Sequence, residues 1–287
     1  MPRTIASLLI IIVIIALPLV GQSPVKFPAV IVYGDSYSDN GNIYRVLDYP
    51  GPPYWNGRFS NGPVAVEDLA FSLAVPLFDY AWGGATTGVG NVVDGGTPEQ
   101  LGNRGLPGMT KSEQTTRYSI PPALVHNALW VVWGSPNDFQ ADGYTNSTAE
   151  AAVERVVAIV ADLQRLGARR ILVPGMGDLG VVPEYIAQGP QVVQLVHNLS
   201  IYFNQRLLAA LPRGVLYYNT FGLYDRMVAN PSAYGLTDVT DPCYSDGIVC
   251  PNPDQYLFWD GAHPTAHVHS ILAQRYYATA LGGLPPP

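Results

Sequence analysis

The feature of this sequence that most constrains its fold is a series of short apolar segments that alternate with amphipathic helices. Strands that are apolar on both faces are typical of a parallel sheet covered by helices on both sides. The segments are 29–33, 77–80, 129–133, 171–173 and 215–218. They predict an α/β chain with a three-layer α/β/α sandwich and a five-stranded parallel sheet.

Three longer helices are predicted between and after these strands. Apolar residues recur every three to four positions in a helix that begins near Thr148, and again over residues 191–211. A last helix is predicted from Pro264 to about residue 281, with Pro264 in its first turn, where proline is tolerated.

Polar and glycine-rich segments directly follow three of the strands. They are 34–36, 83–84 and 137–138. Ligands of parallel sheets bind beyond the carboxyl ends of the strands, so these segments are expected to meet at one edge. Residues 91–125 are rich in glycine and proline and show no strong period, which predicts an insertion over that edge, as a lid or a substrate wall.

The first residues are typical of a secretory signal peptide. Arg3 precedes an apolar stretch that ends near Val20 and is followed by small residues. A membrane anchor is the alternative, but this stretch is shorter than the roughly 20 residues that span a bilayer. We expect a signal peptide over residues 1–22, one domain over residues 23–287, secretion, and no stable membrane association after cleavage.

Export decides how the two cysteines are interpreted. Cys243 and Cys250 lie in one polar loop, and in an oxidising compartment they are expected to form a disulfide. A metal site would need further soft ligands nearby, which this loop lacks. Asn146 and Asn198 begin Asn-x-Ser/Thr triplets and are candidate glycosylation sites in a eukaryotic host.

The composition and charge exclude two other classes of protein. With 48% hydrophobic residues, the chain has too much apolar material to be disordered. The net charge is -7, and basic residues are scattered singly except at Arg169 and Arg170. Nucleic-acid binding requires clustered positive charge, so no nucleic-acid partner is expected.

Ser36 is the candidate nucleophile, because it stands where a strand ends. A serine becomes nucleophilic when a base takes its proton and hydrogen-bond donors stabilise the oxyanion. The candidate base is His263, and Asp260 lies close enough in sequence for one tight turn to bring its carboxylate to the imidazole. Each residue alone is more often structural, and the combination in this order carries the prediction.

Three groups are candidates for the oxyanion hole. They are the backbone N–H groups of Ser36 and Gly84 and the side-chain amide of Asn137. Gly83 is an alternative to Gly84 as the backbone donor. No cofactor or metal is required for this chemistry, and the expected partner is a small-molecule or oligosaccharide ester.

Four segments resemble the sequence blocks of the SGNH (GDSL) hydrolases. They are 33–42, 80–87, 133–138 and 259–264, in the family's order, and the resemblance extends over residues 28 to 280. It implies the flavodoxin-like SGNH hydrolase fold, a Ser36–His263–Asp260 triad and an oxyanion hole from Ser36, Gly84 and Asn137. Gly84 is favoured over Gly83 because Ala85 and Thr86 then match the residues that usually follow in the family. Tyr37 replaces the leucine of the family's name, at a position expected to have no part in the chemistry.

Residues 56–63 and the cysteine loop resemble a narrower branch, the fungal carbohydrate esterase family 16. That resemblance implies a secreted acetylesterase acting on acetylated plant-polysaccharide oligosaccharides. The alternatives are a GDSL lipase or phospholipase acting on longer acyl chains, which should have a broad apolar rim, and a non-catalytic sugar-binding protein. The latter would use the aromatic faces of Trp82 and Trp133. The favoured alternative for these two side chains, and for Trp55 and Trp259, is that they wall the core.

Two further motifs are interpreted as structural and not as ligand-binding sites. Residues 175–180 match a dinucleotide-binding fingerprint, but Pro183 stands where its helix should continue, so a strand-to-loop crossover is expected. His263 and His267 have helical spacing for a metal, but a bound metal would block the base. His267 and His269 are expected on a helix surface or at an interface.

Overall fold

Five strands form one parallel sheet in the computed structural model, which describes residues 27–93 and 122–282. The order in the sheet is β2-β1-β3-β4-β5. The strands are β1 Val30–Gly34, β2 Leu77–Asp79, β3 Leu129–Trp133, β4 Arg170–Pro174 and β5 Leu216–Tyr218. The predicted five-stranded parallel sheet is therefore confirmed, with strand ends shifted by at most one residue.

The two central strands form the core of the sheet. Every residue of β1 and of β3 is buried, and the two strands pair from Val30 opposite Leu129 to Gly34 opposite Trp133. Because both faces of these strands are covered, they contain apolar residues at consecutive positions rather than at alternate ones.

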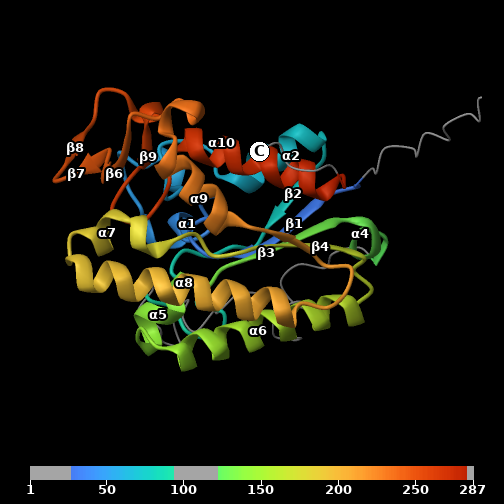
Figure 1. Cartoon of the computed structure of the whole chain (residues 1–287). Coiled ribbons are helices and arrows are strands. Elements are labelled where there is room, and N and C mark those ends of the chain that lie inside the picture. Colours follow the sequence, from blue (N-terminus) through green and yellow to red (C-terminus); the bar gives the residue numbers. More distant parts are fainter. Residues whose placement is uncertain (1–26, 94–121, 283–287) are drawn as a thin grey trace, which may run out of the picture.

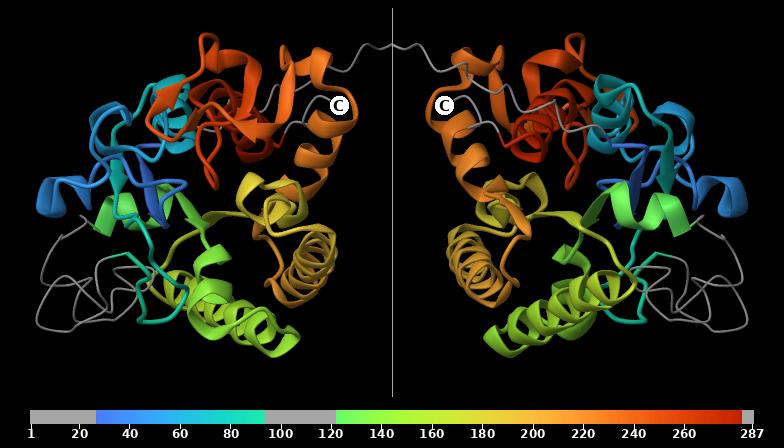
Figure 2. Two further views of the ribbon diagram at one scale, coloured as in Figure 1. Left: turned by 90° about the vertical axis from the view of Figure 1, so that its left-hand side faces the viewer. Right: turned by 90° about the vertical axis from the view of Figure 1, so that its right-hand side faces the viewer.

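Helices cover both faces of the sheet (Figure 1). Helices α2 (Ala65–Leu73) and α10 (Ala266–Ala280) pack together on one face, and α6 (Asn146–Arg165) packs with α8 (Pro190–Ala210) on the other. The two views of Figure 2 look along the sheet and show the same three layers. The predicted α/β/α sandwich is confirmed.

Side-chain caps determine where two of these helices begin. Helix α6 begins at Asn146, two residues before the predicted start, because the Thr145 side chain accepts a hydrogen bond from Thr148 N–H. Helix α10 begins at Ala266, where Thr265 is the cap. Pro264 therefore precedes the helix, and its predicted place in the first helical turn is wrong.

Shorter elements connect the sheet to its covering layers. A two-stranded parallel pair forms between β6 and β9, and a hairpin between β7 and β8. The remaining elements are α1 Tyr44–Leu47, η1 Trp55–Gly57, α4 Pro122–Asn127, α5 Pro136–Asp142, η2 Leu179–Val181, α7 Pro183–Ile186, α9 Thr220–Ala229, η3 Pro231–Tyr234, β6 Asp238–Pro242, β7 Tyr244–Ser245, β8 Ile248–Val249, η4 Pro253–Gln255 and β9 Tyr256–Phe258.

Several predictions from the sequence concern residues outside the described ranges. The signal peptide over residues 1–22 and most of the insertion over 91–125 belong to this group. The two candidate glycosylation sites are described, and both Asn146 and Asn198 are exposed on helices. Among the described residues, no helix is long and apolar enough to span a membrane.

The segment that matches a dinucleotide fingerprint is a crossover, as predicted. After β4 the chain forms the short elements η2 and α7 before the long helix α8 begins at Pro190. The Asp178 side chain accepts a hydrogen bond from Gly180 N–H at 2.8 Å. The helix that a dinucleotide site requires directly after the glycines is therefore replaced by two short turns.

Candidate active site

Ser36 lies in a tight turn directly after β1. The backbone N–H groups of Ser38 and Asp39 both donate to the carbonyl of Asp35 at 3.0 Å, which closes one helical turn around Ser36. Gly34 permits this path, because a Cβ atom at that position would lie 2.7 Å from the carbonyl oxygen of Trp133. The end of the central strand thus fixes the backbone of Ser36.

A second tight loop, between β9 and α10, carries Asp260 and His263. Trp259 N–H donates to the carbonyl of His263 at 2.7 Å and closes the loop. One oxygen of Asp260, Oδ1, accepts from the backbone N–H groups of Ala262 at 2.8 Å and of His263 at 2.7 Å. These two backbone hydrogen bonds orient the carboxylate independently of any side-chain contact.

The two loops bring Ser36, His263 and Asp260 into line. The Ser36 Oγ lies 2.8 Å from Nε2 of His263. The other ring nitrogen, Nδ1, lies 2.9 Å from both carboxylate oxygens of Asp260. This is the geometry in which an imidazole accepts a serine proton while a carboxylate fixes its tautomer.

The electrostatics of the pair agree with that arrangement. Burial opposes the charge of Asp260, but the positive charge of His263 and its hydrogen bond outweigh burial and lower the pKa of Asp260. Burial also opposes a charged His263, yet the carboxylate of Asp260 and its hydrogen bond raise the pKa of His263 above its ordinary value. An ionised aspartate therefore faces an imidazole of increased basicity.

The predicted oxyanion donors border the same cavity. Ser36, Gly84 and Asn137 all line it, and Gly84 adopts a φ of 78°, which favours glycine. The amide of Asn137 donates one hydrogen to the carbonyl of Ala85 at 2.9 Å. An amide carries two hydrogens, so the second one is left for a bound oxyanion.

The structure favours Gly84 over Gly83 as the backbone donor. The N–H of Gly83 already donates to Oδ2 of Asp39 at 2.8 Å, whereas no hydrogen bond from the N–H of Gly84 is found among the described residues. Asp39 also accepts from the N–H groups of Gly41 and Ile43. Asp39 therefore connects the loop after β1 to the loop after β2, a contact that the sequence did not reveal.

The cavity at these residues has a volume of about 170 Å³, below the roughly 300 Å³ at which typical small-molecule pockets begin. Its lining residues Pro136 and Glu184 belong to α5 and α7, which follow the carboxyl ends of β3 and β4 and lie on the left of Figure 1, the side that the left view of Figure 2 turns toward the viewer. Its other lining side chains include Tyr49, Phe59, Val92, Val93 and Gln140.

Asp35 adds a buried carboxyl group beside the nucleophile. Its Oδ1 accepts from Tyr37 N–H at 3.0 Å, whereas its Oδ2 is buried and has no partner among the described residues. Burial raises the pKa of Asp35 to about 7. Because Asp35 lines the cavity, its protonation state changes the charge that a substrate meets near neutral pH.

Of three expectations about residues near the site, the structure corrects one. The Tyr37 hydroxyl donates to the carbonyl of Ala262 at 2.7 Å, next to His263, and its expected absence from the chemistry stays a prediction. The faces of Trp82 and Trp133 are buried, with exposed fractions of 7% and 5%, which agrees with the favoured core role and leaves them unavailable for stacking on a sugar. His269 is also buried rather than at the surface, and its Nδ1 accepts from Ala65 N–H at 3.2 Å.

Tyr54 is a site residue that the sequence did not reveal. Its hydroxyl donates to Oδ2 of Asp260 at 2.7 Å, and its ring meets Tyr244 and Trp259 edge to face. The predicted disulfide between Cys243 and Cys250 is present in this region and joins the two ends of the β7–β8 hairpin, which carries Tyr244. The hydrogen bond from Tyr54 to Asp260 links positions too distant in sequence for any local pattern to predict it.

A parallel α/β sheet with an aligned serine, histidine and aspartate at its carboxyl edge defines the class of α/β serine hydrolases. The chain belongs to the family described as GDSL-like Lipase/Acylhydrolase, whose sequence model matches residues 30–276. It is therefore a carboxylic ester hydrolase, as the four sequence blocks predicted.

Relatives of similar length support this membership. The GDSL esterase/lipase At1g29660 of Arabidopsis thaliana is 27% identical over 88% of this chain and 87% of its own length. The phosphatidylcholine-sterol acyltransferase of Aeromonas hydrophila is 26% identical over 86% of this chain and 88% of its own. The narrower resemblance to carbohydrate esterase family 16 stays a prediction.

One solved structure supports the fold. An active-site mutant of a family two carbohydrate esterase from Clostridium thermocellum superposes with a TM-score of 0.50 at 12% identity. The match covers 92% of this chain and 66% of that one. At this identity the likeness shows a shared fold and carries no information on substrate.

Proposed function

We propose that this chain is a secreted serine esterase that removes acetyl groups from oligosaccharides of plant polysaccharides. The observation that carries the proposal is the alignment of Ser36, His263 and Asp260 at a cavity of about 170 Å³. The proposed catalytic residues are these three, and the proposed oxyanion donors are Ser36, Gly84 and Asn137.

The proposed reaction has two steps. Ser36 Oγ attacks the ester carbonyl and passes its proton to Nε2 of His263, while the N–H donors stabilise the oxyanion. The tetrahedral intermediate then releases the alcohol, which takes the proton from His263, and leaves an acyl-enzyme. Water repeats the sequence with His263 as base, which releases the carboxylic acid and restores Ser36.

Cavity size and lining support a small acyl group on a polar alcohol. At about 170 Å³ the cavity is smaller than typical small-molecule pockets, which begin at roughly 300 Å³. Glu184 and Gln140 line one part of the cavity and supply acceptors for hydroxyl groups of the alcohol. The resemblance of residues 56–63 and the cysteine loop to carbohydrate esterase family 16 adds the plant polysaccharide to this proposal.

Secretion is the second part of the proposal. Its support is the signal-like segment of residues 1–22 together with the disulfide between Cys243 and Cys250. Structural disulfides are rare in reducing compartments. Expression in a eukaryotic secretory host, with N-terminal sequencing of the protein in the medium, tests this part directly.

A series of p-nitrophenyl esters from acetate to palmitate tests the acyl preference of the purified protein. We expect kcat/KM to be highest for acetate and to fall steeply by butyrate, as the resemblance to the carbohydrate esterase family 16 acetylesterases implies. Acetate release from acetylated xylo-oligosaccharides then tests the alcohol. Highest activity at eight carbons or beyond would overturn the acetyl preference.

One observation favours a second candidate, an esterase for longer acyl chains. Tyr49, Val92 and Val93 line the cavity and are 48%, 37% and 37% exposed. They give its mouth an apolar edge, along which a longer chain could lie. The same ester series separates the two candidates, since only a long-chain esterase prefers octanoate to acetate.

A further inference from the structure

The two oxyanion donors outside Ser36 come from different parts of the fold. Gly84 belongs to the loop after β2, and Asn137 belongs to α5, after β3. An oxyanion hole works only if its donors are held at fixed distances from the reacting carbon. The loop of Gly84 and the start of α5 must therefore be fixed against one another.

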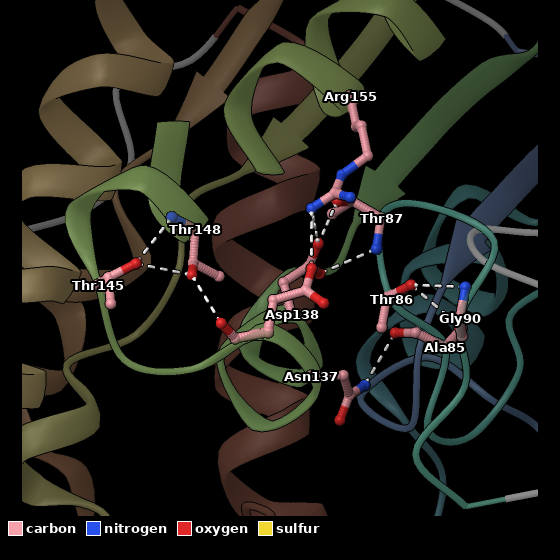
Figure 3. A network of polar contacts seen from close by, with 10 residues as sticks. Ala85, Thr86, Thr87, Gly90, Asn137, Asp138, Thr145, Thr148 and Arg155 are labelled. Atoms are coloured by element: carbon pink, nitrogen blue, oxygen red, sulfur yellow. Dashed lines mark hydrogen bonds and ion pairs between the residues drawn. The ribbon is translucent and has the colours of Figure 1, made fainter. Parts of the chain in front are cut away.

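Asp138 makes the contacts that fix them (Figure 3). Its side chain is fully buried. One oxygen, Oδ2, accepts from Thr87 N–H at 2.9 Å, and the other, Oδ1, accepts from the Thr87 hydroxyl at 2.5 Å. Thr87 lies three residues after Gly84, and Asp138 directly follows Asn137, so these bonds join the two donor segments.

Arg155 completes the contacts from the long helix α6. Its guanidinium donates to Oδ1 of Asp138 at 2.9 Å and lies 3.6 Å from Asp142, farther along α5. A Cβ atom at Gly88 would lie 3.1 Å from the same guanidinium, so the donor loop packs directly against it. The charge of Asp138 is thereby paired although it is buried.

The donor loop is also closed on itself by hydrogen bonds. The Thr86 hydroxyl donates to the carbonyl of Gly90 at 2.9 Å (Figure 3), and Val92 N–H donates to the carbonyl of Gly84 at 2.9 Å. A displacement at Thr87 would consequently be transmitted to Gly84.

We propose that Asp138, Thr87 and Arg155 form a positioning clamp that holds Gly84 and Asn137 at the spacing an oxyanion requires. None of the three touches the reacting atoms in this account. The proposal rests on the oxyanion hole described above. It adds residues that act through Gly84 and Asn137, and it predicts an effect on transition-state binding rather than on substrate binding.

The most selective test is the pair Thr87→Val and Thr87→Ser. Valine keeps the shape of threonine and removes the hydroxyl, whereas serine keeps the hydroxyl. With p-nitrophenyl acetate, Thr87→Val is expected to lower kcat about tenfold with KM within about twofold, because a hydrogen bond to a charged group is lost. Thr87→Ser is expected to restore kcat to within about twofold of wild type.

Binding of methylboronic acid reports on the oxyanion hole without turnover. Boron becomes tetrahedral when Ser36 Oγ adds to it and the serine proton moves to His263, which mimics the intermediate. The dissociation constant for Thr87→Val is expected to rise about as much as kcat falls. A loss of fold stability alone would lower the melting temperature and leave this constant and kcat unchanged.

Arg155→Met and Arg165→Met provide a matched pair on α6. Both arginines pair with an aspartate, Arg155 with Asp138 and Arg165 with Asp162 on its own helix. Only Arg155→Met is expected to weaken boronate binding, because Arg165 is distant from the clamp in sequence and largely exposed. Equal effects of the two substitutions would overturn the proposal.

Asn137→Ala separates failure of the clamp from failure of the oxyanion hole. Loss of one donor is expected to lower kcat about 100-fold or more. If Asn137→Ala is impaired but Thr87→Val binds boronate as wild type does, the clamp is refuted and the oxyanion hole stands. If Asn137→Ala has full activity, the oxyanion hole assigned here is wrong and the clamp is refuted with it.

Discussion

The hydroxyl of Tyr54 donates a hydrogen bond of 2.7 Å to Oδ2 of Asp260, one of the two carboxylate oxygens that face Nδ1 of His263. Asp260 thus has a side-chain donor in addition to the two backbone N–H groups on its other oxygen. Tyr54 comes from the segment before η1, far from Asp260 in sequence. It makes the orientation of the carboxylate depend on two separate parts of the chain.

Removing this hydroxyl is expected to reduce turnover modestly. In Tyr54→Phe, kcat for p-nitrophenyl acetate should fall about tenfold or somewhat more with KM unchanged, since a hydrogen bond to a charged group is worth about 1.5–3 kcal/mol. Tyr244→Phe is the control, because the ring of Tyr244 packs against Tyr54 in the same aromatic cluster. Equal kcat for Tyr54→Phe and wild type would show that the backbone donors suffice.

The pH dependence of kcat/KM is expected to follow His263. The neutral imidazole is the base, so activity rises as pH increases through its pKa. Asp260 raises the pKa of His263, so the midpoint of this rise should lie above 6.5. Asp260→Asn removes the charge and should move the midpoint to lower pH, while kcat falls about 10⁴-fold. An unmoved midpoint would mean that another group titrates.

His269 is expected to destabilise the fold in acid. Burial lowers the pKa of His269 to about 3. In the unfolded chain a histidine takes up its proton near pH 6.5, so the folded state loses stability as pH falls from about 6.5 towards 3. The loss is at most about 1.4 kcal/mol for each pH unit.

Urea unfolding of wild type and His269→Asn at pH 7 and pH 4.5 measures this effect. The variant should lose less unfolding free energy between the two pH values, because asparagine keeps an acceptor for Ala65 N–H and does not titrate. The comparison between the two proteins cancels the contributions of Asp35 and Asp39, whose pKa values burial raises to about 7 and about 6. An equal loss in both proteins would contradict the assignment.

The disulfide is expected to stabilise the region around Tyr54. Cys243→Ser/Cys250→Ser should lower the free energy of unfolding by about 2 kcal/mol, as expected for a short closed loop. The Tyr244 ring, which stacks on Trp259 at 5.6 Å between centroids, lies in the hairpin that the disulfide closes. Guanidinium unfolding measures the loss, and an unchanged midpoint would show that the hairpin is held by its packing alone.

The fold was predictable because it depends on patterns within short segments. Residues 29–33 and 129–133 are apolar throughout, as is typical of short strands that are buried on both faces. The structure confirms both strands. The alternation with helices then restricts the sheet to parallel pairing. The start of α10 was missed because proline marks a first turn less strictly than the Thr265 hydroxyl does.

The site was predictable only in part, since its residues act through contacts between distant segments. Ser36 and His263 stand in recognisable local motifs and meet as expected. Tyr54 and Arg155 stand in no such motif. Each contributes through a hydrogen bond to a carboxylate in another segment, Asp260 for Tyr54 and Asp138 for Arg155. Trp82 lies in the core, as favoured over stacking on a sugar, since an aromatic side chain beside a motif often belongs to the core.

The most direct test of the central claim is hydrolysis of p-nitrophenyl acetate by Ser36→Ala. The substitution removes the attacking oxygen and should leave the fold intact, which circular dichroism and the melting temperature verify. The proposed mechanism predicts that kcat falls by at least about 10⁴-fold. A folded Ser36→Ala protein with wild-type activity would contradict the assignment of Ser36 as the nucleophile.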